Sequence, residues 1–198
     1  MADKIPSGLY ALYDDSFPER VVDVIAAGVQ VVQLRLKKTS DRDALALARR
    51  LKARVPVLII NDRVDLALLA GCGVHLGADD LPVAEARKML GPGANIGATC
   101  RSLDDIARAK EQGADHVGLG PVFPSRTKSL PVPLLGVERL AEVCARSPLP
   151  VVAISGIDET NIGDVAKAGA HAAAVCAALF GHDDVRARAG MMLSLWRR

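Results

Sequence analysis

The chain of 198 residues is poor in aromatic side chains, with only 3% Phe, Trp and Tyr. This scarcity excludes the stacking platforms on which proteins bind single-stranded nucleic acids, and it leaves Ala, Val and Leu to fill the core. Net charge is also small, at +2. Such a small charge gives no overall attraction to a polyanion, so we expect no nucleic-acid partner.

Long apolar runs and paired cysteines are missing as well. No apolar run approaches the roughly 20 residues that span a bilayer, and the segment Met1–Pro6 lacks the apolar core of a signal peptide. We therefore expect a cytoplasmic protein that does not enter a membrane. The cysteines at 72, 100, 144 and 176 form no Cys-x-x-Cys, which favours reduced core thiols over disulfides or a zinc site.

What the sequence does contain is a repeated alternation of apolar runs and amphipathic segments. The run Val57–Ile60 is typical of a buried strand, and it ends at Asn61 and Asp62 before a segment with helical periodicity. The same succession recurs along the chain. Strands are predicted at residues 9–13, 31–37, 57–60, 73–77, 95–99, 116–122, 151–154 and 171–177.

Eight strand-then-helix units in about 200 residues predict a TIM (β/α)₈ barrel, near the lower length limit of that α/β fold. A doubly wound sheet is the alternative, but no Gly-x-Gly-x-x-Gly follows the first strand. No linker or shift in composition marks a boundary. We therefore expect residues 1–198 to form a single domain.

Two carboxylates follow neighbouring strands of this predicted barrel. All strand carboxyl ends open on one face, so Asp62 and Asp80 should meet there. Magnesium prefers oxygen ligands, commonly one or two carboxylates completed by phosphate and water. Each aspartate also precedes a helical segment and could simply cap it. The sequence is compatible with both interpretations.

Basic residues supply positive charge that complements the two carboxylates. Arg35 and Lys37 share one face of their strand with Gln33, and Lys128 lies in the long loop 123–135. Cations facing a barrel interior need a neutralising anion. Arginine offers phosphate a bidentate donor and lysine a point charge. A solvated strand end would explain Lys37 equally well, but Arg35 poorly.

The last strand ends carry a pattern that suits a phosphate group. Gly156 and the pair Val175–Cys176 match the backbone N–H site commonly found after the seventh and eighth barrel strands. A tight turn explains Gly156 equally well. His75 ends the fourth strand toward the same mouth, although a single histidine is more often structural than catalytic.

Taken together, the segments that carry these residues resemble the thiamine phosphate synthase family. They are 33–37, 60–62, 73–80, 96–99, 118–128, 153–157 and 173–177. They cover nearly the whole chain in order, which is more specific than any single motif. The resemblance implies a TIM barrel enzyme, a transferase. Its reaction joins hydroxymethylpyrimidine pyrophosphate to hydroxyethylthiazole phosphate and gives thiamine phosphate and pyrophosphate.

The resemblance also implies a role for individual residues. Asp62 and Asp80 would hold Mg²⁺ on the leaving pyrophosphate. Candidate catalytic residues are Arg35, Lys37 and Lys128. The residues implied to bind substrate are Gln33, Leu34, Arg35, Leu36, Lys37, Asn61, His75, Thr99, Ser125, Arg126, Thr127, Lys128, Gly156, Val175 and Cys176. The expected partners are therefore two small molecules, and the oligomeric state stays open, with a homo-oligomer included.

Four positions depart from the usual family pattern. Leu36 stands where an acid is common, and Ala78 replaces a frequent glutamine. Ser155 replaces the first glycine of a Gly-Gly pair, and Cys176 replaces a common serine. The last two changes fall at the end of the site that would hold the thiazole phosphate.

Two other functions compete with the synthase. A related thiazole tautomerase shares the barrel and the thiazole-phosphate pocket, but it would not need Asp80 or Lys128. A non-catalytic barrel that binds thiamine precursors would have little use for a full set of cations and metal ligands. We therefore favour the synthase.

Overall fold

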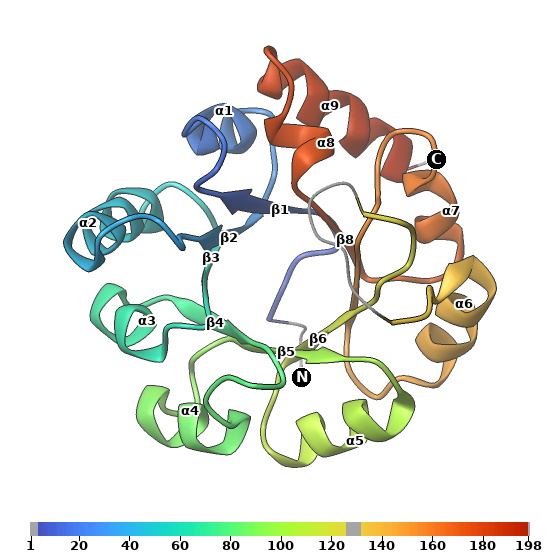
Figure 1. Ribbon diagram of the computed structural model, residues 1–198, viewed down its shortest axis with the longest axis horizontal. Coiled ribbons are helices and arrows are strands. Elements are labelled where there is room, and N and C mark those ends of the chain that lie inside the picture. Colours follow the sequence, from blue (N-terminus) through green and yellow to red (C-terminus); the bar gives the residue numbers. More distant parts are fainter. Residues whose placement is uncertain (1–3, 126–131, 198) are drawn as a thin grey trace.

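Eight parallel strands close into a barrel with the helices on its outside (Figure 1). The computed structural model describes residues 4–125 and 132–197. The strands follow one another around the barrel in chain order, and the eighth pairs back to the first. The predicted TIM barrel is confirmed. None of the described helices is long and apolar enough to cross a membrane.

The elements alternate as the sequence predicts. The strands are β1 (Gly8–Asp14), β2 (Val31–Arg35), β3 (Val57–Asn61), β4 (Gly73–Leu76), β5 (Ile96–Cys100), β6 (His116–Leu119), β7 (Val151–Ile154) and β8 (Ala172–Val175). The helices are α1 (Val21–Ala26), α2 (Asp41–Lys52), α3 (Val64–Ala70), α4 (Val83–Leu90), α5 (Leu103–Glu111), α6 (Gly136–Arg146), α7 (Ile162–Lys167), α8 (Ala177–Phe180) and α9 (Val185–Trp196).

Alternation along each strand divides the buried side chains into two cores. In β3, Leu58 and Ile60 pack in the larger core between the strands and the helices. Ile59 lies between them in sequence and belongs to a separate, smaller cluster with Tyr10 and Ile5. Successive side chains of a strand point to opposite faces, so this smaller cluster fills the barrel interior.

Local signals fix several helix starts. Ser40 and Ser102 precede α2 and α5, and their hydroxyl oxygens accept hydrogen bonds from backbone N–H groups three residues later, at 3.2 and 3.1 Å. Each bond satisfies a backbone donor that the first helical turn leaves unpaired. These two serines therefore cap α2 and α5.

Several strands end earlier than predicted, and β6 for example ends at Leu119 rather than at residue 122. The second strand ends at Arg35 rather than Lys37, because Asp15 Oδ2 accepts the backbone N–H groups of Lys38 (2.6 Å) and Thr39 (2.9 Å) and turns the chain. The last strand ends at Val175, and the short helix α8 follows it. A four-residue helix is too short to show a periodic pattern.

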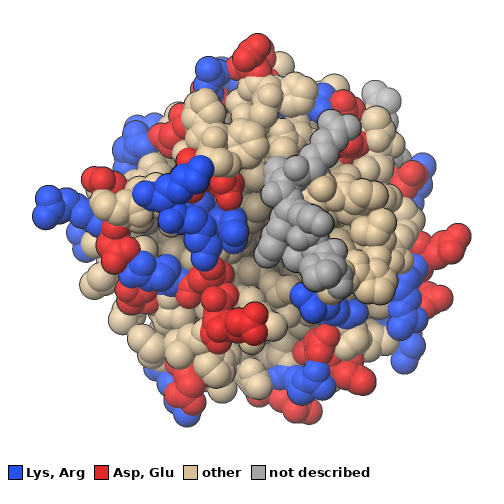
Figure 2. Space-filling model, viewed as in Figure 1, with Lys and Arg blue, Asp and Glu red and all other residues tan. Residues whose placement is uncertain are grey.

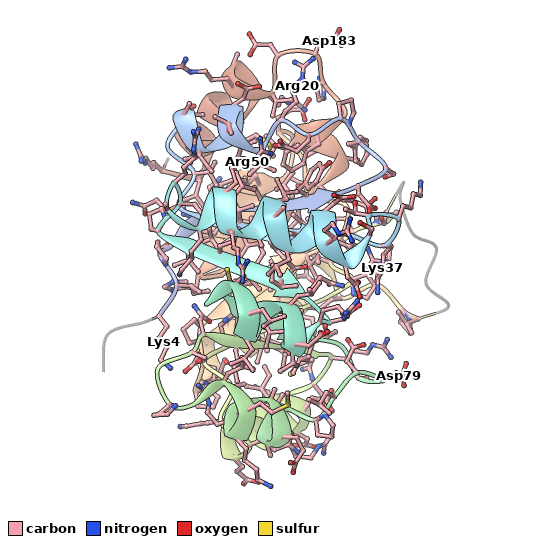
Figure 3. The ribbon with its side chains drawn as sticks, turned by 90° about the vertical axis from the view of Figure 1, so that its left-hand side faces the viewer. Lys4, Arg20, Lys37, Arg50, Asp79 and Asp183 are labelled. Atoms are coloured by element: carbon pink, nitrogen blue, oxygen red, sulfur yellow. The ribbon has the colours of Figure 1, made fainter. Side chains whose placement is uncertain are left out.

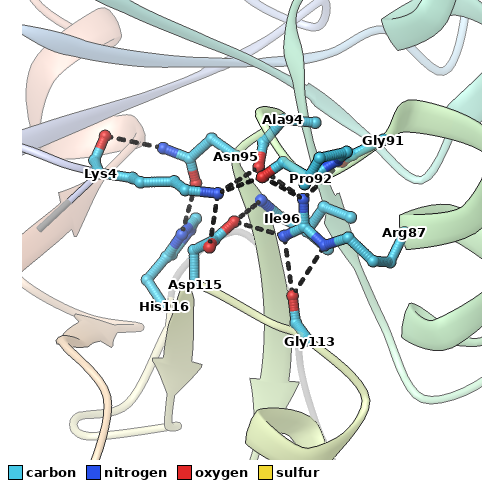
Figure 4. Close-up of polar contacts among 10 residues, drawn as sticks. All are labelled: Lys4, Arg87, Gly91, Pro92, Ala94, Asn95, Ile96, Gly113, Asp115 and His116. Atoms are coloured by element: carbon cyan, nitrogen blue, oxygen red, sulfur yellow. Dashed lines mark hydrogen bonds and ion pairs between the residues drawn. The ribbon is translucent and has the colours of Figure 1, made fainter. Parts of the chain in front are cut away.

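A polar network closes the amino-terminal end of the barrel. Lys4 Nζ donates to the backbone carbonyls of Pro92 (3.0 Å) and Ala94 (2.9 Å) and forms an ion pair with Asp115 (2.9 Å) (Figure 4). Arg87 of α4 donates to the same carboxylate at 2.7 Å. The N-terminal segment is thus tied to the turns that precede β5 and β6.

Replacing Arg87 tests how much this network stabilises the fold. Its side chain is only 19% exposed, so Arg87→Met would leave several carbonyls and part of a carboxylate without their donor. We expect the free energy of unfolding, measured with urea, to fall by about 2–3 kcal/mol. Lys88→Met on the same helix breaks only an exposed pair with Glu85 and should cost less than about 0.5 kcal/mol. Equal losses would contradict this assignment.

Candidate functional site

The carboxyl ends of the strands form one mouth of the barrel. Figure 2 looks onto this face, where acidic and basic side chains lie next to each other beside a central hollow. Figure 3 shows Lys37 and Asp79 on this side of the molecule and Lys4 on the opposite side. Lys37, one of the residues expected to act on a substrate, therefore lies at the end that carries function in barrels of this kind.

The basic residues of β2 meet acidic partners at the mouth. Arg35 Nε donates to Asp14 Oδ2 at 3.1 Å, and Lys37 forms an ion pair with Asp62. Asp14 ends β1 and was not among the predicted site residues. The rule that selected the other strand ends applies to Asp14 equally, so the sequence did contain the signal that identifies it.

Asp62 and Asp80 are held against each other, with a hydrogen bond between their side chains. Asp62 has a left-handed backbone (φ 65°) and donates its N–H to the His75 carbonyl at 2.8 Å. Asp80 Oδ2 accepts the N–H of Gly77 at 2.7 Å. The predicted convergence of the two carboxylates is what the structure shows.

The two carboxyl groups have pKa values that move in opposite directions. Burial raises the pKa of Asp62, but Lys37, Asp80 and Arg35 outweigh burial and hold it below its usual value. Burial and then the bonded Asp62 raise the pKa of Asp80 above its usual value, with only partial relief from the N–H of Gly77 and from Lys37. Unequal surroundings are the cause of this split, because Lys37 and Arg35 favour the charged form of Asp62 while Asp62 disfavours the charged form of Asp80.

The structure separates the two interpretations of these aspartates. Helices α3 and α4 begin after Arg63 and Pro82, and neither helix has a side-chain cap. Asp62 and Asp80 are therefore not helix caps. Their close approach is costly for two carboxylates, and a divalent cation between them would remove that cost.

The donor set fits magnesium. In the described part of the chain, no group of three or more His, Cys, Asp or Glu side chains could enclose a metal. A pair of carboxylates leaves most of an octahedral shell to phosphate oxygens and water, which is how magnesium is usually bound at phosphate-transfer sites.

The polar uncharged residues predicted on β2, β3, β4 and β5 occupy the inward-facing positions of those strands. Gln33 is buried and its Nε2 donates to the hydroxyl of Tyr10 at 2.8 Å. The Nδ2 of Asn61 is buried without a partner among the described residues. His75 Nε2 lies 3.1 Å from Thr99 Oγ1. Burial lowers the pKa of His75 to about 4, and nearby Asp62 offsets only part of that shift, so the ring is neutral.

Three of the predicted substrate-binding residues turn their side chains away from the mouth. Leu34 and Val175 are buried in the core between strands and helices, and Leu36 packs against the same core. Only their backbone groups remain available to a substrate. The departure from the family pattern at Leu36 therefore lies outside the mouth itself.

At the end predicted to bind the thiazole phosphate, the chain packs closely around Gly156. Its φ is 67°, and a Cβ there would lie 2.4 Å from the Pro124 carbonyl oxygen and 2.7 Å from Phe123 Cβ. Ser155 has a φ of 86°, and its hydroxyl donates to the Phe123 carbonyl at 3.1 Å. The serine thus replaces the usual glycine despite its strained backbone, and its side chain ties down the loop after β6.

The rest of this end is only partly described. Ser125 is half-buried, and the predicted residues Arg126, Thr127 and Lys128 lie outside the described residues. Val175 is buried at the end of β8, and Cys176 follows it. Burial and nearby Asp14 raise the pKa of the Cys176 thiol to about 12, so the thiol is neutral.

Residues 8–179 match the model of a family described as thiamine monophosphate synthase. The chain belongs to this family. It is 47% identical over 182 residues to the thiamine-phosphate synthase of Myxococcus xanthus, covering 86% of this chain and 84% of that protein. It is 46% identical over 190 residues to that of Anaeromyxobacter dehalogenans, covering 93% and 86%.

A solved structure agrees with the family. Thiamine phosphate pyrophosphorylase from Pyrococcus furiosus is 30% identical, with a TM-score of 0.87 and coverage of 98% of this chain and 96% of that one. The resemblance to thiamine phosphate synthases in the sequence is thus confirmed. The roles of individual residues remain expectations.

The crowding of the carboxylates predicts that the site lowers the stability of the metal-free protein. In Asp80→Asn the new amide can still accept from Gly77 and can donate to Asp62. We expect the free energy of unfolding at neutral pH to rise by up to about 1 kcal/mol, since this partly exposed pair is screened by solvent.

The pH dependence of this gain follows from the raised pKa of Asp80. Above that pKa both carboxylates are charged in the wild type and the amide relieves their repulsion. As the pH falls through that pKa, wild-type Asp80 binds a proton and the gain should vanish. Urea unfolding of wild type and Asp80→Asn at several pH values measures this difference in the free energy of unfolding, with the exposed Asp79→Asn as control. A loss of stability in Asp80→Asn at neutral pH would contradict the proposed repulsion.

Proposed function

We propose that this protein condenses hydroxymethylpyrimidine pyrophosphate with hydroxyethylthiazole phosphate to give thiamine phosphate and pyrophosphate. The names of its relatives support this reaction. The observation that carries the proposal is the Asp62–Asp80 pair with Lys37 and Arg35 beside it. This arrangement suits a metal-bound diphosphate at the barrel mouth.

In this proposal Asp62 and Asp80 hold Mg²⁺, which neutralises charge on the leaving pyrophosphate when bound. Lys37 now pairs with Asp62, and a metal on that carboxylate would release the ammonium group to a pyrophosphate oxygen. Arg35 uses Nε for Asp14, which leaves its two terminal nitrogens for bidentate contact with phosphate. The protein thus exchanges internal ion pairs for contacts with the leaving group.

The reaction itself needs little from acids and bases. An aminopyrimidine stabilises a positive charge on its methylene carbon, so the C–O bond breaks and pyrophosphate leaves with the electron pair. The thiazole nitrogen then forms the new C–N bond. Catalysis lies in alignment and in neutralising the departing charge. In the described site, His75 and Cys176 have pKa values of about 4 and about 12, neither suited to proton transfer near neutrality.

The pyrimidine ring would meet Gln33 and Asn61. Because Gln33 donates its Nε2 to Tyr10, its carbonyl oxygen is left to accept from the amino group of the substrate. The buried Nδ2 of Asn61 has no partner among the described residues and would gain one from the substrate. Tyr10 was not predicted from the sequence, since a tyrosine within a strand that contacts a substrate cannot be told by pattern from one that only packs in the core.

For the thiazole phosphate we propose backbone N–H groups at Gly156 and at Val175–Cys176, with Ser125 and Thr127 as hydroxyl donors. A neutral thiol at Cys176 adds no charge that would repel phosphate. The usual serine donates more strongly than a thiol does. The backbone groups therefore carry most of this contact.

A thiazole tautomerase or a non-catalytic precursor-binding barrel explains the site less well. Neither needs the carboxylate pair, which is unfavourable without a cation. We also propose that the enzyme acts in the cytoplasm on small molecules, without nucleic acid. The oligomeric state, a homo-oligomer included, stays a prediction.

Incubation with both phosphorylated substrates, with and without magnesium, tests this proposal by the pyrophosphate released. We expect release to require magnesium and kcat/KM to fall by at least about 100-fold in Asp62→Asn, because electrostatic stabilisation of the leaving group is lost. Asp79→Asn, an exposed neighbour of the site, should retain activity. Magnesium-independent release, or full turnover in Asp62→Asn, would refute the metal site.

A further inference from the structure

One guanidinium group joins two segments that follow neighbouring strands. Arg188 lies in α9, and its side chain is only 14% exposed. Its Nε donates to the backbone carbonyl of Ala178 in α8 at 2.8 Å, and its Nη2 forms an ion pair with Glu159 in the loop after β7. An arginine can bind two partners at once because its donors are fixed in a planar fork. Arg188 therefore cross-links α8 to the loop after β7.

The loop on the Glu159 side is bonded to Gly156. Asn161 Nδ2 donates to the Gly156 carbonyl at 2.9 Å, and Asn161 Oδ1 accepts the N–H of Asp158 at 3.0 Å. The N–H of Asn161 donates in turn to the Asp158 carbonyl at 3.3 Å. These bonds close the segment 156–161 into one turn that contains Glu159. The position of Gly156 is therefore coupled to that of the turn.

The segment on the Ala178 side is bonded to Cys176. The carbonyl of Cys176 accepts the N–H groups of Leu179 and Phe180, both at 2.9 Å. Ala178 lies within this single turn. The last carbonyls of a helix have no partner inside it, and Arg188 supplies a donor to that of Ala178. One helical turn thus connects Cys176 to the guanidinium.

The two connected positions follow adjacent strands. β7 and β8 pair in parallel, with Ile154 opposite Ala174. Gly156 and Cys176 each come two residues after this pair, at the same end of the barrel. They are two of the positions whose backbone N–H groups would bind the thiazole phosphate in the proposed function. Each belongs to a different segment, and Arg188 binds both segments.

We propose that Arg188 is a positioning residue for the thiazole phosphate. It holds the backbone at Gly156 and the backbone at Cys176 at the separation that one phosphate group needs. Hydrogen bonds weaken steeply away from their normal length and angle, so a phosphate held from two segments requires a fixed distance between them. The inference rests on the proposed function and adds a residue outside the predicted site to it.

Calorimetric titration of hydroxyethylthiazole phosphate into the full chain tests this role. Magnesium and pyrophosphate are present, so the other part of the site is filled and no turnover occurs. In Arg188→Met we expect the Kd to rise about threefold to thirtyfold, because one or two hydrogen bonds to phosphate are weakened. An unchanged Kd in Arg188→Met would overturn the inference alone. Absence of binding in the wild type would overturn the proposed function and the inference with it.

Arg87→Met is the matched control. Arg87 is also mostly buried and also binds backbone carbonyls and a carboxylate, but it does so at the amino-terminal end of the barrel. Its replacement should lower the free energy of unfolding and leave the Kd unchanged. An equal rise of the Kd in both arginine variants would show a merely structural role and overturn the positioning role.

Steady-state kinetics provides a second readout. We expect the KM for the thiazole phosphate to rise in Arg188→Met by about the same factor as the Kd. The KM for the pyrimidine pyrophosphate should change less than about twofold, because its proposed contacts lie on other strands. An equal rise of both KM values would contradict a role confined to the thiazole phosphate.

Glu159→Ala keeps the inference testable if Arg188→Met does not fold. The side chain of Glu159 is 36% exposed, and its removal leaves the bond from Arg188 to Ala178 in place. We expect the Kd for the thiazole phosphate to rise about twofold to fivefold. Adding Glu159→Ala to Arg188→Met should raise the Kd no further, because both changes break the same cross-link. An unchanged Kd in Glu159→Ala would overturn the inference.

Discussion

Two carboxylates in hydrogen-bonding contact at the end of a barrel are the constraint on which the rest of this site depends. Asp62 and Asp80 follow the ends of the neighbouring strands β3 and β4. A hydrogen bond from the Asp62 N–H to the His75 carbonyl and one from the Gly77 N–H to Asp80 Oδ2 hold them in place. In the proposed function, a bound cation offsets this unfavourable contact. Such sites commonly lower stability where function requires crowded charge.

The basic side chains around this pair are placed so that a ligand can replace their acidic partners. Lys37 is bound to Asp62 and Arg35 to Asp14, so each of these two cations already has an acidic partner before any ligand arrives. Pairs between partly exposed groups are individually weak. In the proposed function, a metal-bound diphosphate displaces these pairs at small cost, while the strands keep the side chains in place. Pre-positioned charge of this kind makes the largest contribution to transition-state stabilisation in many enzymes.

Much of the site follows from a single local rule. Polar residues after apolar strands indicated Asp62, Asp80, Arg35 and Asn61, and all four lie at the predicted mouth. The rule holds because parallel barrel strands present their carboxyl ends on one face. Applied consistently, it would also have found Asp14. The helix α8 gave no signal, since four residues do not complete a period.

The sequence alone determined the barrel, the chemistry of its mouth and the family, because periodicity and strand-end residues are local properties of the chain. Only the tertiary structure decided which charges meet. The sequence alone allowed Arg35 to bind either a phosphate or a carboxylate, and in the structure it binds Asp14. Asp62 and Asp80 could cap helices, and they bind each other. Pairing depends on distances between strand ends that are far apart in the chain, and those distances exist only once the barrel has closed.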